Sequence, residues 1–150
     1  MLLHIELLHL VIDRPKWDVL KILLSKLTNL RQLDLMLPPL QSSYIMPTKM
    51  LAKSVSMDRL KVLRITGPRK LKLSQQYPDI SFLLRDLLKR IQMPRLEELW
   101  LMRVASTERH SVKKFLNEHA ASIVALELEL VRPFTHSLCY FSESQFISKQ

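Results

Sequence analysis

A short phrase of apolar residues recurs five times along this chain of 150 residues and constrains its fold more than any other feature. The phrase reads L-x-x-L-x-L, with isoleucine allowed for leucine, and it begins at Ile5, Leu30, Leu60, Leu96 and Ile123. Successive starts are 25, 30, 36 and 27 residues apart. Segments that recur at a period of roughly 20 to 50 residues are typical of solenoids, in which each unit completes the core of its neighbour. The repetition therefore predicts a stack of parallel strands, one from each unit.

Between the strand phrases, the spacing of apolar residues predicts helices. The last of these helices begins after an N-cap at Ser106 or Thr107. Its apolar face contains Val112, Phe115 and Leu116. The four expected helices occupy about 15–28, 47–56, 79–92 and 107–119.

Alternating strands and helices are also typical of doubly wound α/β enzymes. Two observations favour the solenoid. The five strands share one phrase, whereas the strands of a doubly wound sheet usually read as unrelated apolar runs. The chain also contains a single glycine, Gly67, which excludes the glycine-rich loops that hold phosphates in nucleotide-binding enzymes.

The composition predicts one globular domain without covalent cross-links. Hydrophobic residues make up 47% of the chain and charged residues 25%, which suits a folded core rather than a disordered chain. No apolar run reaches the length of about 18 residues that a membrane-spanning helix needs. Because Cys139 is the only cysteine, no intramolecular disulfide can form, and a cytoplasmic or nuclear location is expected.

The strand phrase resembles that of leucine-rich repeats. Two longer segments are similar to the repeats of fungal F-box proteins of the leucine-rich-repeat class, a resemblance that covers roughly residues 2–130. One segment is Met93 to Leu99, and the other fits F-L-x-x-H-x-x-x-[IL]-x-x-L-x-L. The second stands here as Phe115-Leu116, His119, Ile123, Leu126 and Leu128. The resemblance implies an α/β solenoid: a right-handed superhelix of about five repeats, with a parallel sheet on its concave side and helices on its convex side.

The same resemblance implies a non-catalytic domain that recruits substrates to a cullin-type ubiquitin ligase. In that family an F-box, which this sequence lacks, binds a Skp-type adaptor, while the repeats recognise the substrate protein. The repeats would occupy residues 1–131, and residues 132–150 would be a frayed tail or the loop and first helical turn of a sixth repeat. Because solenoids need polar caps, we expect the chain to be a fragment of a longer repeat array.

Side chains alternate along a strand, so residues between the consensus leucines should line the concave sheet. Trp100 is the most prominent of them, because tryptophan is enriched at the energetic centres of interfaces. It either contacts a partner protein or packs against an ascending loop. Val11, Val62 and Ala125 are expected on the same face. The predicted partner-binding residues are His9, Gln32, Asp34, Met36, Arg64, Thr66, Arg69, Lys70, Glu98, Trp100, Met102, Glu127 and Glu129.

Positive charge is concentrated in the middle of the chain. The net charge is +9 overall and +7 within residues 51–103. A basic cluster around the turn after the third strand could contact phosphates or an acidic protein segment, or could be a solvated surface. Nucleic-acid binding is therefore one alternative function, and a piece of an immune-type receptor with leucine-rich repeats is another. The cluster consists of Arg64, Arg69, Lys70 and Lys72, preceded by Lys61, and Glu127 and Glu129 make the opposite end of the face acidic.

No group of residues has the spacing of a catalytic or metal site. Glu97 and Glu98 are adjacent on a strand and should project to opposite sides. None of the histidines has the spacing of a zinc ligand set; His136 and Cys139 are close in sequence, but no second pair accompanies them. His119 is expected to interact with a helix dipole. The sequence therefore predicts neither an enzyme nor a metal or cofactor.

Overall fold

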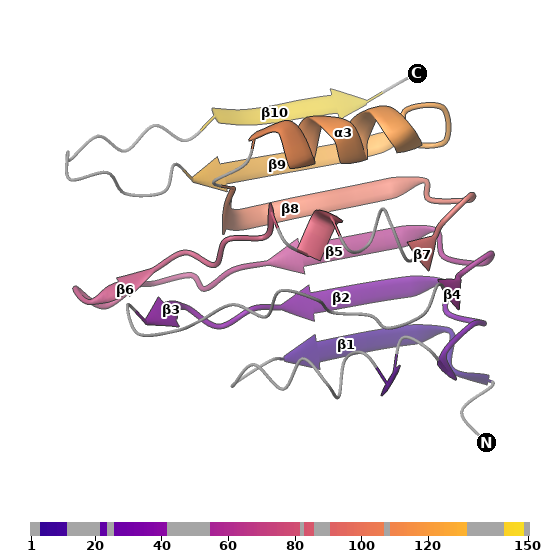
Figure 1. Cartoon of the computed structure of the whole chain (residues 1–150), viewed down its shortest axis with the longest axis horizontal. Coiled ribbons are helices and arrows are strands. Elements are labelled where there is room, and N and C mark those ends of the chain that lie inside the picture. Colours follow the sequence, from indigo (N-terminus) through magenta and orange to yellow (C-terminus); the bar gives the residue numbers. More distant parts are fainter. Residues whose placement is uncertain are drawn as a thin grey trace.

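A six-stranded sheet forms the framework of the molecule. A computed structural model describes residues 4–11, 22–23, 26–41, 55–81, 83–85, 91–106, 109–131 and 143–148. The strands of the large sheet are β1 (Leu7–Val11), β2 (Gln32–Met36), β5 (Val62–Thr66), β8 (Glu98–Ala105), β9 (Ala125–Val131) and β10 (Glu143–Ser148). They lie in the order β1-β2-β5-β8-β9-β10 (Figure 1). Five strands are parallel, and β10 runs antiparallel to β9. The predicted α/β class with a parallel sheet is confirmed.

The five copies of the strand phrase share one register. The first in-strand consensus position pairs with its equivalent in every neighbouring strand, and so does the second, two residues later. Since strand order also follows chain order, each copy adds to the same edge of the growing sheet. The two aligned rows are Leu8, Leu33, Leu63, Leu99 and Leu126, then Leu10, Leu35, Ile65, Leu101 and Leu128.

A tight turn precedes three of the five strands and lengthens the repeated unit. The amide of Leu60 donates to the carbonyl of Met57 at 3.1 Å, and the amide of Leu96 donates to the carbonyl of Met93 at 3.2 Å. Leu30 and Leu27 make the same contact at 3.3 Å. Leu27, Met57 and Met93 are all buried, so the repeated unit begins three residues before the phrase.

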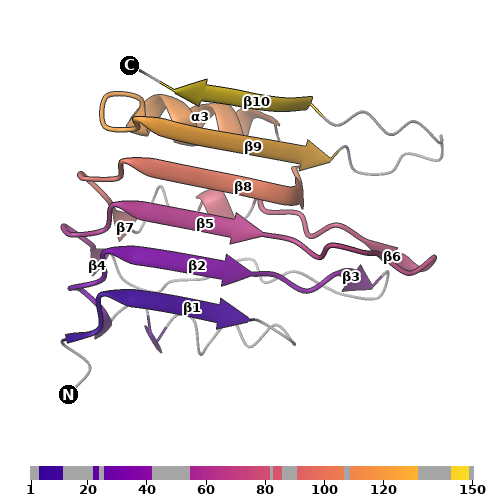
Figure 2. The same cartoon turned by 180° about the vertical axis from the view of Figure 1, so that it is seen from behind.

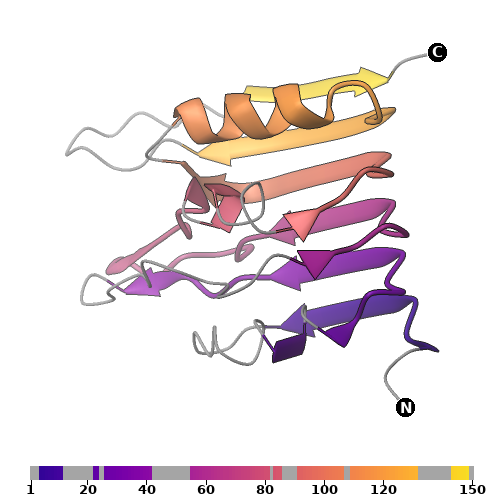
Figure 3. The same cartoon turned by 45° about the vertical axis from the view of Figure 1, so that its right-hand side comes forward.

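One face of the sheet carries the core. The helix α3 (Arg109–His119) lies on this covered face, beside β9 (Figures 1 and 3). Phe115 of α3 is fully buried, and Val112 is nearly so, as the helical spacing predicted. The reverse face is not covered by any of the described elements (Figure 2). The consensus side chains of β2, β5 and β8 meet a second buried layer that includes Met57, Leu60, Ile80, Leu83, Leu84, Ile91, Met93, Leu96 and Phe115.

Two helix predictions were wrong at their ends. Val55–Ser56 forms β4 and Ile91–Gln92 forms β7, and these two segments pair in parallel. Ile91 is buried, but in a strand rather than on the predicted helix of 79–92, where only residues 81 and 83–85 are helical among those described. Apolar residues suit either structure, and pairing with a segment 36 residues away decided between them. A further antiparallel pair joins β3 (Leu40–Gln41) to β6 (Gln75–Gln76).

The remaining element predictions met mixed outcomes. Most of the expected helix 15–28 lies outside the described residues, and residues 22–23 and 26 are helical. The expected helix 107–119 is α3, described from Arg109 onward. Of the tail 132–150, only 143–148 is described, and it forms β10 rather than a helical turn of a sixth repeat.

Gly67 occupies a position where the backbone of another strand leaves no room for a side chain. A Cβ atom here would overlap the carbonyl oxygen of Arg103. Arg103 has a left-handed φ of 53° and lies at a β-bulge between Met102 and Val104. The Gly67 amide donates to the carbonyl of Met102 at 2.8 Å, and the Arg103 Nε donates to the Gly67 carbonyl at 3.3 Å. Because it has no side chain, the only glycine of the chain lets the backbone that follows β5 approach the bulge in β8 and form hydrogen bonds with it.

Candidate functional site

The uncovered face of the sheet collects most of the predicted partner-binding residues. We define the open face as the side chains that alternate with the consensus positions in the five parallel strands. All of them are exposed or half-buried. The predicted alternation is confirmed in β1, β2, β5 and the first half of β8, whereas every residue of β9 is half-buried. The open face comprises Leu7, His9, Val11, Gln32, Asp34, Met36, Val62, Arg64, Thr66, Glu98, Trp100, Met102, Ala125, Glu127 and Glu129.

A row of polar side chains crosses the middle of the open face. His9, Asp34, Arg64, Trp100 and Glu127 are successive register partners. The Asp34 Oδ2 lies 3.7 Å from the His9 Nδ1 and 3.9 Å from an Arg64 guanidinium nitrogen. This row combines residues from five parts of the sequence because the strands pair in register.

Asp34 is less exposed than the two side chains with which it is paired. Its side chain is 19% exposed, against 36% for Arg64. The Gln32 Nε2 donates to both Asp34 carboxylate oxygens, at 3.1 and 3.2 Å. Since the carboxylate accepts from an amide and faces a guanidinium, its negative charge is compensated locally.

Arg64 and Trp100 form the centre of the open face. The Arg64 guanidinium carbon lies 4.9 Å from the centroid of the Trp100 ring, within the range of a cation–π contact. A second Arg64 nitrogen lies 3.7 Å from the Glu98 Oε2. Trp100 is half-buried, and Arg64 is one of the side chains in contact with it.

Two hydrogen-bond donors in this centre have no acceptor among the described residues. They are the Arg64 Nε and the Trp100 Nε1, and both atoms are covered. A buried donor without an acceptor costs about 1–3 kcal/mol. Such groups are rare in folded proteins, and here the two belong to side chains in contact with each other.

Two further ion pairs lie at the edge of the sheet where the parallel strands begin, and we call these four residues the rim. Lys61 Nζ lies 2.7 Å from Glu97 Oε1, and an Arg31 guanidinium nitrogen lies 3.5 Å from Glu6 Oε1. All four side chains are between 44% and 58% exposed, so solvent screens both pairs. Their charges cancel, and the rim adds no net charge to the open face.

The structure divides the predicted basic cluster. Arg64 projects from the middle of β5 and is balanced by Asp34 and Glu98. Arg69, Lys70 and Lys72 are exposed and lie beyond the end of β5. The three residues beyond β5 are not part of the strand, so they do not belong to its alternating face, whereas Arg64 does. Arg69 and Lys70 therefore lie outside the open face.

The sequence reasoning missed Leu7 and the role of Gln32. Leu7 is 58% exposed and continues the alternation of β1 by one residue, so the same rule could have found it. Gln32 was predicted to face a partner, but its side-chain amide is engaged by Asp34. Gln32 and Asp34 are two residues apart on one strand, so their side chains lie on the same side of the sheet. This spacing could have predicted their hydrogen bond.

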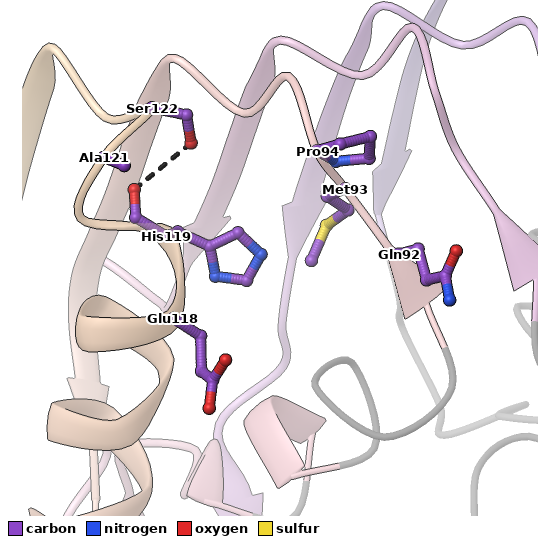
Figure 4. A pocket seen from close by; sticks show the side chains of 7 residues that line it. All are labelled: Gln92, Met93, Pro94, Glu118, His119, Ala121 and Ser122. Atoms are coloured by element: carbon purple, nitrogen blue, oxygen red, sulfur yellow. Dashed lines mark hydrogen bonds between the residues drawn. The ribbon is translucent and has the colours of Figure 1, made fainter.

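A pocket of about 330 Å³ lies on the covered side, between β7 and the end of α3 (Figure 4). The His119 ring points toward Met93, whereas the Glu118 carboxylate points away from it. The His119 Nδ1 lies 3.0 Å from the Phe115 carbonyl oxygen, and the ring packs against that of Phe115 at 4.5 Å between centroids. Ser122 Oγ donates to the His119 carbonyl at 3.2 Å. These contacts give His119 a packing and capping role.

No group of three or more His, Cys, Asp or Glu side chains within the described ranges could hold a metal ion. His136 and Cys139 lie outside those ranges. In the same part of the chain, no helix combines the length and apolar character that crossing a membrane requires. Comparisons with protein-family models, curated proteins and solved structures give no match.

Proposed function

We propose that this chain is a leucine-rich-repeat domain whose open face binds another protein. The observation that carries the proposal is the single register of five parallel strands in chain order. This register presents one continuous surface of side chains, and solenoids typically use such surfaces for binding. The buried turns that precede Leu30, Leu60 and Leu96 support the same proposal, because they extend the resemblance between repeats.

We further propose that the domain recruits substrates to a ubiquitin ligase, as the repeats of F-box proteins do. Support comes from the segment 115–128, whose resemblance first suggested that family. Phe115 and Ile123 are buried, and the His119 ring packs on Phe115, so three characteristic residues of the segment form one packing unit. Such a function needs no catalytic group, metal or cofactor in this chain.

Site-specific photo-crosslinking tests the proposal that the open face binds protein. A benzophenone amino acid replaces Met36 or Met102 on the open face, or the exposed Lys113 on α3 as a control. Irradiation in the source cells should yield discrete protein adducts from the two open-face positions and not from Lys113. Equal adducts from all three positions, or none from the open face, would contradict the proposal.

The ubiquitin-ligase role has a separate test. Overproduced alone, this chain should compete for the substrate and raise the level of the crosslinked protein, whereas the Trp100→Ala variant should not. The chain alone should not bind a Skp-type adaptor, since that contact belongs to an F-box in the family. Unchanged substrate levels despite crosslinking would leave a binding domain that serves another pathway.

Nucleic-acid binding is a second candidate, favoured by the exposed Arg69, Lys70 and Lys72 beyond β5. It predicts binding to a single-stranded oligonucleotide that weakens steeply with salt, with a log-log slope of about 0.7 per phosphate contact. The Arg69→Glu, Lys70→Glu variant should abolish such binding, while Trp100→Ala should not. A salt-independent affinity, or none, would remove this candidate.

A further inference from the structure

The open face has a charge opposite to that of the whole chain. The complete sequence carries a net charge of +9. On the open face, the carboxylates of Asp34, Glu98, Glu127 and Glu129 stand against the single guanidinium of Arg64. With His9 neutral, this leaves an excess of three negative charges on that face. Surface charge of one sign attracts partners of the other sign and repels its own.

The uncompensated charge lies on β9. Asp34 and Glu98 each lie within 3.9 Å of Arg64. Glu127 and Glu129 form no ion pair with a cation among the described residues. They are half-buried and are the register partners of Trp100 and Met102. A carboxylate in such a position is only partly hydrated. Its attraction for an approaching cation is therefore stronger than that of a fully exposed carboxylate.

From this charge pattern, we propose that the open face binds an extended protein segment with Lys or Arg at alternate positions. The proposal rests on the proposed protein-binding function and adds the chemistry of the partner. Alternate side chains of an extended chain lie about 7 Å apart. Glu127 and Glu129 are also alternate residues of a strand, so two cations of the segment match the two carboxylates in spacing and in sign.

The Arg64–Trp100 centre supplies hydrogen-bond donors for the backbone carbonyl groups of such a segment. The Arg64 Nε and the Trp100 Nε1 have no acceptor in the part of the chain that the structure describes, and an extended segment carries unpaired carbonyl groups along both edges. Both donor atoms are covered, so a rotation of these side chains must accompany the contact. The environment of the indole ring changes with that rotation, which makes Trp100 a reporter of binding.

A phosphate backbone is a poorer occupant of the open face. Its charges would approach Glu98, Glu127 and Glu129 and be repelled. The exposed cations of the predicted basic cluster that form no ion pair with a described residue, Arg69, Lys70 and Lys72, lie beyond the end of β5 and not on the open face. Binding of an oligonucleotide to the open face is therefore an alternative outcome of the test below.

The test begins with a phage-displayed library of random dodecapeptides selected on the whole chain. Peptides with Lys or Arg at alternate positions should be enriched. Their affinities are then measured for the wild type, for the Glu127→Gln, Glu129→Gln variant, and for Glu118→Gln, which removes a carboxylate from the exposed surface of α3. Glutamine keeps the shape of glutamate, so thermal melting should confirm that all variants fold.

We expect the double variant to bind the enriched peptides about tenfold more weakly at low salt, because it removes two charge contacts. Glu118→Gln should change affinity less than about twofold, and the difference should shrink at high salt. In a Trp17→Phe background, Trp100 is the only tryptophan of the chain. Its fluorescence should then shift when the peptide binds.

The possible failures are distinguishable. Enrichment of neutral or acidic peptides that Trp100→Ala no longer binds would overturn the charge inference and keep the protein-binding function. Peptides that bind equally to the wild type, the double variant and Trp100→Ala would overturn both, as would a library without enrichment. A single-stranded oligonucleotide that binds the double variant more tightly than the wild type, and shifts Trp100 fluorescence, would assign the open face to nucleic acid instead.

Discussion

The covered and open faces of the sheet are built from alternate residues of the same strands, yet they follow different rules. On the covered face, Leu33, Leu63 and Leu99 are at most 1% exposed, and each register partner is another aliphatic residue. On the open face, a row can hold histidine, aspartate, arginine, tryptophan and glutamate in turn. Repetition therefore stabilises the fold on one face, while the side chains of the other face differ from strand to strand.

The largest expected effect is the loss of a buried aliphatic side chain. Leu63→Ala should lower the free energy of unfolding by about 2–5 kcal/mol, because it leaves a cavity in a fully buried position. Val62→Ala, one residue earlier on the half-exposed face, should cost less than half as much. Urea unfolding followed by circular dichroism measures both. Equal losses of unfolding free energy in the two variants would mean that Val62 is also packed in a core.

A smaller but still large effect is expected at the contact between β5 and the bulge of β8. Gly67→Ala should cost about 1–3 kcal/mol, since the added methyl group overlaps the Arg103 carbonyl and forces the backbones apart. Thr66→Ala is the matched control on the open face, and we expect it to be close to neutral. The same unfolding experiment applies. A neutral Gly67→Ala would show that the bulge yields easily.

Trp100→Ala should separate binding from folding. Affinity for a peptide selected on the open face should fall by about 2 kcal/mol, as expected of a tryptophan at the centre of an interface. The free energy of unfolding should fall by less, because the ring is only half-buried. Isothermal titration calorimetry and urea unfolding give the two quantities. The reverse ranking would make Trp100 a packing residue.

The smallest effect is expected at the rim. A double-mutant cycle with Lys61→Met and Glu97→Gln should give a coupling energy below about 1 kcal/mol that falls further in high salt, since both side chains are nearly half exposed. The cycle between Asp34→Asn and Arg64→Met should give the larger coupling, because Asp34 is 19% exposed. A larger coupling energy for Lys61 and Glu97 than for Asp34 and Arg64 would mean that the stronger ion pair lies outside the open face.

Local periodicity predicted the parts of this fold that repeat. The positions of the five strands, their parallel pairing and the burial of alternate residues all follow from one phrase. The short pair β4 and β7 does not, because two-residue strands carry too little pattern to be distinguished from a helix end. The composition of the open face was largely predicted, but the interactions within it were not. Arg64 was predicted to lie in a basic cluster with Arg69 and Lys70, but its ion pairs with Asp34 and Glu98 were not predicted.

The sequence by itself determined which side of each strand is buried, because a period of two combined with a repeated aliphatic phrase leaves one consistent arrangement of the strands. Only the tertiary structure decided which polar residues meet. Pairing in a single register sets Asp34, Arg64 and Trp100 side by side although they are 30 and 36 residues apart in the chain. It also leaves Glu127 and Glu129 without a cation from the described residues. Contacts between distant residues depend on register and side-chain direction, and the balance of charge on a surface depends on those contacts.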